Sequence, residues 1–411
     1  MFRRIPALLA IVSLAIFLTS AFAVSGEQVT YSFDGDPNGS TPSARLIADA
    51  NGNLYGTAAS GCAFNYGCVF ELSKVEDSWI ETVLFNFSGP DGATPTTSLL
   101  LDAVGNLYGT TALGGDFNSG VAFQLTSTHG TWNETVLHSF GSGTDGYTPS
   151  ELILDSTGNL YGITQFGGDS SSGPDNGGTV YRLTLTDGQW NETILYSFPG
   201  SFLGPDGDLP IGGLALDKTG NLYGVTQAGG VYGKGAVFTL TATAEGTFAE
   251  SIIHSFHILD GNLPNSTPVF DSAGNLYGTT FFGGAVRDCP NEGCGVIYEL
   301  KKNSDGTWTE ILLRQLQKAD GWEAVGPVVF DSVGNLYAAA QAGGAFTWGS
   351  IFQLSPRSQT PWPEHIIHYF ANYPDGASPY AGVTFDSVGN LFGTTSGGGA
   401  SQMGTIFEIP K

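Results

Sequence analysis

The stretch Asp102-Ala103-Val104-Gly105-Asn106-Leu107-Tyr108-Gly109-Thr110-Thr111 decides the fold of this chain, because it recurs along the whole sequence. Its centre, Gly-Asn-Leu-Tyr, is found six times, and a seventh copy has Phe in place of Tyr. The copies start at Gly52, Gly105, Gly158, Gly220, Gly274, Gly334 and Gly389. A repeat of roughly fifty-five residues is typical of an architecture in which one supersecondary unit is used many times.

Each unit contains four short stretches with the composition of β-strands. In the second unit they span residues 99–101, 106–111, 121–125 and 134–140. They are rich in β-branched, aromatic and other apolar residues, and Gly, Asp, Asn or Pro bounds them. The sequence therefore predicts an all-β fold of repeated four-stranded antiparallel units.

Two other positions recur in the units. An aspartate stands three residues before each repeat glycine, as Asp102 does before Gly105, and this spacing is typical of a hairpin turn. Seven carboxylates could suggest metal ligands, but every copy of a turn needs this chemistry, so we interpret them as turn residues. An aromatic residue also precedes a Glu by two positions in six units, and we expect it to pack between units. These residues are Trp79, Trp132, Trp190, Phe248, Trp308 and Trp362.

Seven four-stranded units favour a β-propeller with radially arranged blades. A β-solenoid is the alternative, but its coils are usually shorter and its ends need capping repeats. The last unit stops after its third strand, at residues 405–409, whereas residues 27–33 match the fourth strand of the second unit in register. We therefore predict a seven-bladed β-propeller that an N-terminal strand closes by completing the last blade.

The repeat resembles a known family. Its successive motifs are Gly-Asn-Leu-Tyr-Gly-Thr-Thr, Gly-Gly, Gly-x-Val-Phe-x-Leu, Val-Leu-His-Ser-Phe and Asp-Gly-x-x-Pro. Together they are similar to the GloVer tandem repeat of the choice-of-anchor group of bacterial secreted and surface proteins. The resemblance covers nearly the whole chain and implies export and a propeller-like fold, but it implies no activity. No C-terminal anchor is visible after the last strand, so we expect a released or periplasmic protein.

Residues 1–23 have the features of a secretory signal peptide. Arg3 and Arg4 precede an apolar run that ends in the small-x-small site Ala21-Phe22-Ala23. A retained membrane anchor is the alternative; we favour cleavage, which leaves residues 24–411 as a single secreted or periplasmic domain without membrane contact. The 14 Lys and Arg stand against 38 Asp and Glu, and this negative charge disfavours nucleic acid as a partner. We expect a monomer.

The four cysteines form two local pairs, Cys62 with Cys68 and Cys289 with Cys294. Both pairs lie between the second and third strands of their units. Export favours a disulfide in each pair, whereas a zinc site of four thiolates would need the first and fifth units to meet at these loops.

One acidic loop is a candidate calcium site. Asp34, Asp36 and Asn38 match the first half of a calcium-binding loop, but Arg45 stands where an EF-hand needs Glu. A smaller oxygen-ligand site is one interpretation, and a solvated acidic turn is the other. Apart from possible calcium at this loop, we expect no cofactor.

Histidines occupy one repeat position on the fourth strand, as His138, His254 and His368. Tyr, Phe or Arg stands there in the other units, and this interchange predicts a surface position rather than a metal or catalytic site. The Asp-Gly-x-x-Pro connections that follow the fourth strand are interpreted as turns.

The signatures Gly-x-Ser-x-Gly and His-Glu-x-x-His are absent from the sequence, so it stays open whether the protein is an enzyme. The loops between strands two and three carry aromatic residues that turn chemistry does not require. These candidate ligand-binding residues are Tyr66, Phe117, Tyr232, Phe346 and Trp348. We therefore expect a binding or interaction module for a carbohydrate or peptide. A secreted enzyme acting on extracellular glycan or a related polymer, and a structural envelope component, are the alternatives.

Overall fold

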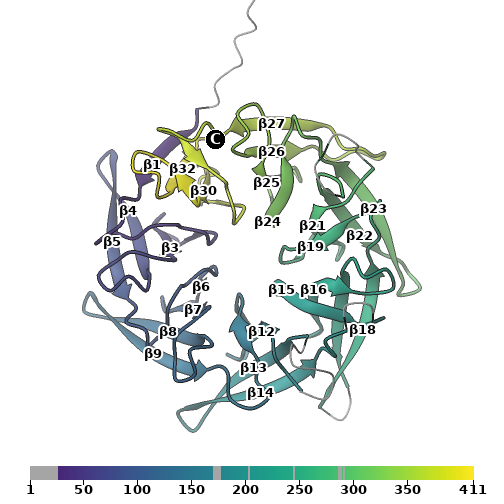
Figure 1. The fold of residues 1–411 in the computed structure, drawn as a ribbon, viewed down its shortest axis with the longest axis horizontal. Helices are drawn as coiled ribbons and strands as arrows, with labels where there is room; N and C mark the ends of the chain where they lie inside the picture. Colours follow the sequence, from purple (N-terminus) through teal and green to yellow (C-terminus); the bar gives the residue numbers. More distant parts are fainter. Residues whose placement is uncertain (1–25, 170–176, 202–203, 244–245, 286–288, 290–291) are drawn as a thin grey trace, which may run out of the picture.

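The chain forms a ring of blades around a central opening (Figure 1). The computed structural model describes residues 26–411 except 170–176, 202–203, 244–245, 286–288 and 290–291. The signal peptide predicted over residues 1–23 lies outside the described residues. In the described part the regular structure is β-strand, and no helix there could cross a membrane. The strands form a seven-bladed β-propeller of antiparallel blades, which confirms the predicted fold.

Four blades have one strand at each of their four positions, counted from the opening to the rim. The first blade contains β2 (Ile47–Ala48), β3 (Leu54–Ala58), β4 (Cys68–Val75) and β5 (Ser78–Asn86), and the second contains β6 (Leu100–Leu101), β7 (Leu107–Thr111), β8 (Val121–Thr128) and β9 (Thr131–Ser139). The fourth contains β15 (Gly207–Leu216), β16 (Leu222–Gly229), β17 (Ala236–Ala242) and β18 (Phe248–Ser255), and the sixth contains β24 (Trp322–Phe330), β25 (Leu336–Ala342), β26 (Ser350–Leu354) and β27 (Glu364–Tyr369).

The other three blades differ at the inner position. In the third blade β10 (Tyr147–Pro149) and β11 (Ile153–Leu154) pair with β12 (Leu160–Phe166), followed by β13 (Thr179–Thr186) and β14 (Gln189–Ser197). In the fifth, β19 (Asn262–Pro264) and β20 (Val269–Phe270) pair with β21 (Leu276–Phe282), followed by β22 (Val296–Lys302) and β23 (Trp308–Gln315). The seventh contains β29 (Val383–Phe385), β30 (Leu391–Thr395), β32 (Thr405–Ile409) and β1 (Gln28–Ser32), with a separate pair of β28 (Gly376–Ala377) and β31 (Gly397–Gly398).

An aspartate holds the turn between the first two strands of each blade. Asp102 Oδ1 accepts the backbone N–H groups of Val104 and Asn106, and its Oδ2 accepts the Asn106 amide and the Tyr108 hydroxyl. Burial alone would raise the pKa of the equivalent Asp155, but hydrogen bonds of this kind lower it to about 2. The same turn occurs at Asp49, Asp217, Asp271, Asp331 and Asp386. The interpretation of these carboxylates as turn residues is confirmed.

The hydrophobic core is divided into clusters that lie between neighbouring blades. Phe87, directly after the outer strand of blade one, is fully buried against Phe123 of blade two, with ring centroids 5.1 Å apart. A Cβ atom on Gly109 would lie 2.7 Å from the Phe123 ring, so this glycine makes room for the ring. Trp132 packs against the same cluster, as the recurring aromatic residue was expected to do. Equivalent ring pairs are Phe33–Phe70, Phe140–Tyr181, Phe198–Phe238, Phe256–Tyr298 and Phe370–Phe407.

The connections between blades share one face of the ring with the loops between strands two and three. The N–H of Thr148, in the connection to blade three, donates to the carbonyl of Ser119 in a loop of blade two, at 3.0 Å. Beside this bond a Cβ atom on Gly120 would lie 2.5 Å from Pro149. Because Gly120 also has a φ of +102°, no other residue fits this contact well.

The N-terminal strand closes the ring. β1 pairs with β32 in antiparallel register, from Gln28 opposite Glu408 to Ser32 opposite Thr405. Phe33 continues from this strand into the cluster between blades seven and one, where it contacts Phe70. The closure predicted from the two incomplete ends of the repeat array is therefore confirmed.

Both predicted disulfides are present. Cys62 is bonded to Cys68 and Cys289 to Cys294, with Cα–Cα distances of 6.0 and 5.2 Å. Each closes a short segment between the second and third strands of a blade.

We expect substitution of the closing strand to destabilise the whole ring. Phe33→Ala should lower the free energy of unfolding by about 3–5 kcal/mol, because a fully buried ring is lost. Val29→Ala on the same strand is the control, since Val29 is partly exposed and should cost less than about 1 kcal/mol. Chemical denaturation of both variants measures the difference. Equal stability of the two variants would contradict closure by this strand.

Candidate functional site

A cavity of about 690 Å³ lies where the central channel opens. Its wall comes from the inner strands and connections of all seven blades, from Thr41 in the first to Tyr380 and Ser396 in the last. Thr41 and Thr148 belong to the blade connections, so the cavity opens on the face that carries the loops between strands two and three. Hydroxyl and amide side chains make up much of the wall, so the cavity is suited to a polar ligand.

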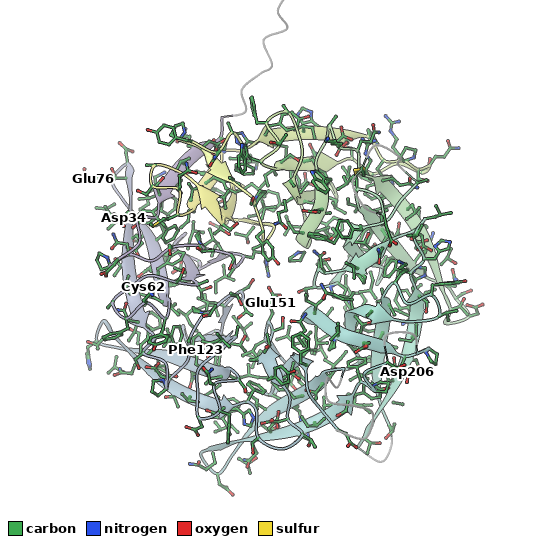
Figure 2. The ribbon with its side chains drawn as sticks, viewed as in Figure 1. Asp34, Cys62, Glu76, Phe123, Glu151 and Asp206 are labelled. Carbon is green, nitrogen blue, oxygen red and sulfur yellow. A yellow bond between two sulfur atoms is a disulfide. The ribbon has the colours of Figure 1, made fainter. Side chains whose placement is uncertain are left out.

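Glu151 is the carboxylate of this cavity, and it lies at the central opening (Figure 2). Its Oε1 accepts a hydrogen bond from the Ser98 hydroxyl at 2.6 Å, and its Oε2 accepts one from the Thr267 hydroxyl at 2.8 Å. Thr267 is held in turn by the backbone N–H of Gly213, at 2.7 Å. Residues of blades two, four and five therefore fix the position of this carboxylate group of blade three.

Several buried polar atoms of residues in the wall have no partner within the protein. They include Asn265 Oδ1, Gln341 Oε1, Ser43 Oγ and Arg45 Nε. A buried polar atom without a hydrogen bond costs free energy, so these atoms favour a ligand or solvent that supplies donors and acceptors. Sequence reasoning placed none of these residues in a functional site.

The aromatic residues predicted to bind a ligand lie on the same face but outside this cavity. None of the five lines it among the described residues, and each ring is 42% to 58% exposed. Their loops do reach the blade connections: the carbonyl of Tyr66 accepts the N–H of Thr94, and that of Trp348 accepts the N–H of Ser378. The rings are Tyr66, Phe117, Tyr232, Phe346 and Trp348. Since they do not fill the gaps between blades, they are accessible to a partner, and their binding role stays a prediction.

The candidate calcium loop lies in the connection from β1 to blade one. Asp34 and Asp36 are exposed, and the Asn38 amide donates to Asp34 Oδ1 at 3.2 Å. Asn38 holds the repeat position of the Asp-Gly connections, since Gly39 exchanges backbone hydrogen bonds with Gly35 as Gly92 does with Gly89. Oxygen ligands of this kind suit calcium, but the loop also forms its own hydrogen bond. Calcium binding by Asp34, Asp36 and Asn38 therefore stays a prediction.

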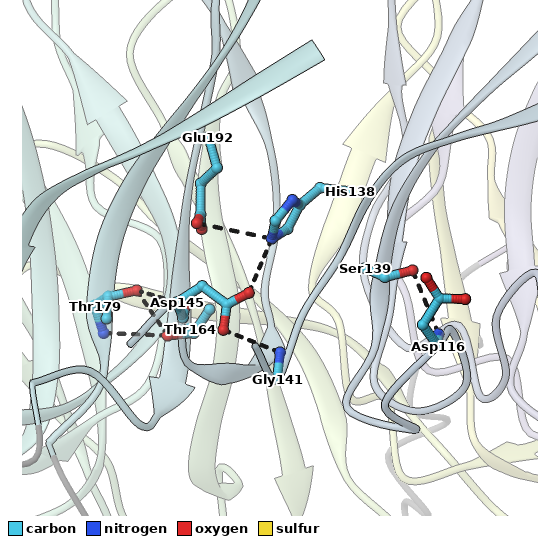
Figure 3. Close-up of polar contacts among 8 residues, drawn as sticks. All are labelled: Asp116, His138, Ser139, Gly141, Asp145, Thr164, Thr179 and Glu192. Atoms are coloured by element: carbon cyan, nitrogen blue, oxygen red, sulfur yellow. Dashed lines mark hydrogen bonds and ion pairs between the residues drawn. The ribbon is translucent and has the colours of Figure 1, made fainter. Parts of the chain in front are cut away.

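The recurring histidines lie between blades rather than on the surface, which corrects the interpretation from the sequence. The His138 side chain is 22% exposed, and its Nε2 lies 3.1 Å from Asp145 Oδ2 and 3.7 Å from Glu192 Oε2 of the next blade (Figure 3). Asp145 Oδ1 also accepts the N–H of Gly141, so the aspartate stabilises its own turn as expected. The sequence did not reveal this because the partner glutamate belongs to the following unit.

A glutamate of this kind is partly buried at each of the seven blade interfaces. The seven are Glu27, Glu81, Glu134, Glu192, Glu250, Glu310 and Glu364. Where no cation faces it, burial raises the pKa of Glu134 to about 7, and the nearby Asp91 adds to the rise. Glu250 behaves in the same way beside Asp206. The rim of the ring thus holds carboxylates that are costly to ionise.

The comparisons with known proteins agree with this architecture. The model of the Gloeobacter/Verrucomicrobia repeat matches residues 20–218, 166–289 and 210–411. The chain belongs to this repeat family. Its resemblance to the GloVer repeat is thereby confirmed. No curated protein matches the sequence.

Solved structures share the fold at low sequence identity. A protein described as a candidate 6-phosphogluconolactonase from Bacteroides uniformis superposes with a TM-score of 0.56 at 14% identity, over 83% of this chain and 88% of that one. The extracellular domain of a candidate one-component system from B. thetaiotaomicron gives 0.54 at 12% identity, over 92% of this chain and 40% of that one. At these identities the similarity shows the propeller fold alone.

In this Gloeobacter/Verrucomicrobia repeat protein the cavity is lined at positions where the repeats differ. The second strand of each blade contains the motif Leu-Tyr-Gly-Thr-Thr or a variant of it. The residue directly after this motif has a small side chain in some blades and a large polar or aromatic one in others. In blade order these residues are Ala59, Ala112, Gln165, Gln227, Phe281, Gln341 and Ser396, and the last five line the cavity. Gln165 donates to Gln227 at 3.4 Å, so neighbouring members of the set also interact. This variation gives the cavity the asymmetry that a specific site needs, and aligning the seven units is the signal that could have revealed it.

A few polar residues of the loops occur in one unit and do not recur in the others: Asp175, Lys234, Arg287, Asp288 and Glu292. Lys234 Nζ is 2.6 Å from Glu292 Oε2, which also accepts the Asn262 amide. Asp175, Arg287 and Asp288 lie outside the described residues. The described part of this set forms an ion pair rather than an acid–base pair facing a cavity.

The buried glutamates predict that this repeat protein loses stability as pH rises from about 4.5 to about 7. In the unfolded chain Glu134 and Glu250 ionise above 4.5, whereas in the fold they keep their protons up to about 7, so the unfolded state binds fewer protons. The double substitution Glu134→Gln and Glu250→Gln should therefore raise the free energy of unfolding at pH 8, because it removes two carboxyl groups that are costly to ionise. The gain should be roughly 1–2 kcal/mol per site, since water reaches part of each side chain and reduces the effect. At pH 4 it should change little.

Denaturant titrations at the two pH values measure this effect. Glu76→Gln, at an exposed hairpin turn, is the matched control and should change stability equally at both. A double variant whose gain is the same at pH 4 and pH 8 would contradict the assignment of raised pKa values to the interface glutamates.

Calcium at the N-terminal loop gives a separate prediction. If Asp34, Asp36 and Asn38 bind the ion, calcium at ten times its Kd should stabilise the fold by about 1.4 kcal/mol. Asp36→Ala should abolish that response, while Asp116→Ala, in a loop of blade two, should leave it intact. Thermal melting with and without added calcium measures both, and an identical response in wild type and Asp36→Ala would rule out this site.

Proposed function

We propose that the protein is an extracytoplasmic binding module whose channel-mouth cavity takes a neutral carbohydrate. The observation that carries this proposal is the set of buried, unpartnered polar atoms of residues that line the cavity, beside the fixed carboxylate of Glu151. Sugars present many hydroxyl groups, each a donor and an acceptor, and they can satisfy such atoms without carrying charge. The volume of about 690 Å³ lies in the range of small-molecule sites.

The rigidity of the wall supports binding by a preformed site. Glu151 is held by hydroxyl groups from two other blades, and Gln165 is held by Gln227. A ligand would therefore meet groups that are already ordered, which lowers the entropic cost of binding. Phe281 and the half-exposed Tyr380 add ring surface on which a sugar face can pack.

The cavity favours binding over hydrolysis of glycans. Glycoside hydrolysis usually needs two carboxylic groups, one acid and one base or nucleophile. Among the described residues that line the cavity, Glu151 is the only carboxylate. Turnover of a bound sugar would nevertheless establish the alternative, a secreted enzyme acting on extracellular glycan.

The location outside the cytoplasm rests on two observations. Both disulfides are of the kind that persists in oxidising compartments, and one structural neighbour is an extracellular domain. The exposed rings of Tyr232 and Trp348 on the same face then provide a second surface, which would contact the longer part of a polymer or a peptide.

A glycan array, followed by calorimetry with the best-bound oligosaccharide, tests the proposal. Gln341→Ala, Arg45→Ala and Glu151→Gln should each weaken binding about tenfold, since each removes about one hydrogen bond. Val104→Ala, on a highly exposed turn at the opposite face, is the control and should bind like wild type.

Tyr232→Ala and Trp348→Ala separate the two surfaces. If these variants weaken binding and the cavity variants do not, the ligand binds the loops and the cavity assignment is wrong. Binding to no carbohydrate on the array would overturn the proposed ligand class, and product formation would replace the binding module by an enzyme.

A further inference from the structure

Three of the blade interfaces bring one histidine and two carboxylates together. In each, a His at the end of an outer strand faces the Asp of its own connection and the Glu of the next blade. The sets are His138, Asp145 and Glu192; His254, Asp260 and Glu310; and His368, Asp375 and Glu27. Each residue contributes one nitrogen or oxygen, and within a set these atoms lie within 4.8 Å of one another.

The spacing of these atoms is close to that of ligands around a small divalent cation. His138 Nε2 lies 3.1 Å from Asp145 Oδ2 and 3.7 Å from Glu192 Oε2, and the three side chains converge on one point (Figure 3). His368 Nε2 lies 3.0 Å from Asp375 Oδ2 and 3.9 Å from Glu27 Oε2. With metal–ligand bonds of about 2.0–2.2 Å, neighbouring ligands of a tetrahedral ion are separated by roughly this much, so little movement is needed.

Buried atoms without partners are present at the same places. Oε1 of the interface glutamate is buried and accepts no hydrogen bond at each of the seven interfaces, and at the interface of blades four and five His254 Nε2 takes part in none either. The Glu27 side chain is only 9% exposed. Leaving a carboxylate buried without full compensation is costly, and a cation bound between the carboxylates would remove that cost.

A fourth interface shows how this fold compensates two carboxylates that face each other across neighbouring blades. There Arg314 replaces the histidine, and its Nη2 lies 2.7 Å from Asp320 Oδ2 and 2.5 Å from Glu364 Oε2. The guanidinium group places a permanent positive charge between the aspartate of one blade and the glutamate of the next. The position therefore accepts a cation between the two carboxylates.

We propose that the three histidine-containing interfaces are binding sites for a divalent transition metal ion, with Zn²⁺ the best match. One imidazole and two carboxylates suit zinc, whereas calcium takes oxygen ligands. Because the glutamate belongs to the neighbouring blade, each ion would join two blades at the rim of the ring. The interface of blades four and five has a further nitrogen ligand at hand, since His257 Nδ1 lies 2.6 Å from Asp260 Oδ2.

The test is the number of zinc ions bound by the metal-free chain, residues 24–411 without a histidine tag. Zinc titration against a coloured competing chelator should give three equivalents, and saturation should raise the melting temperature. His138→Ala, His254→Ala and His368→Ala should each lose one equivalent. His365→Ala, on an exposed position of β27, should still bind three.

A gain-of-site variant keeps the test decisive if an alanine variant folds poorly. Arg314→His restores the histidine at the fourth interface and should bind a fourth equivalent. Binding of cobalt in place of zinc, followed by its visible absorption, should show the same stoichiometry. No zinc bound at micromolar concentration, zinc binding that survives all three alanine substitutions, or no fourth equivalent in a folded Arg314→His protein would overturn the proposal.

Discussion

The structure depends on the contact between an aromatic ring at the end of one blade and an aromatic ring in the third strand of the next. Phe87 against Phe123 is an example, and Gly109 leaves the space that the second ring occupies. No blade buries its apolar surface alone, because the buried clusters lie between blades. A blade is therefore stable only with two neighbours, and the ring provides two neighbours for each blade without terminal caps.

Because the core lies between blades, the residues at the blade interfaces recur in the repeats, whereas the residues that face the channel can differ. The turn aspartates, the glycines and the interface rings serve the same contacts in nearly every blade, so they repeat. The side chains that face the channel differ between blades, as Gln341 and Phe281 do, and the contacts that they make across blades, such as Gln165 with Gln227, do not repeat around the ring. Seven similar units can thus surround one asymmetric cavity. The rim shows an intermediate case, since the carboxylates between blades recur while their partner varies among His, Tyr, Phe and Arg.

Much of the fold could be predicted because its determinants are local. The turn at Asp102 involves residues within six positions, and each disulfide joins cysteines five or six residues apart. The cavity and the rim sites could not be predicted in this way. Glu151 is held by Thr267, which is 116 residues away, and His138 faces a glutamate of the following unit. Such pairs form only when the curvature of the ring is known, and for that reason the histidines were interpreted as surface residues.

Closure of the ring by β1 also constrains the order in which the chain can fold. Thr30 of β1 donates its hydroxyl hydrogen bond to Ile406, a residue 376 positions later. Synthesis delivers β1 before the other described strands and its partner β32 after them, so β1 stays unpaired while the intervening blades form. The entropy of closing so long a loop rises only slowly with its length, so the cost lies less in equilibrium stability than in the exposure of two strand edges during that interval. Newly made chains at high local concentration would exchange this strand between molecules unless their last blade forms quickly.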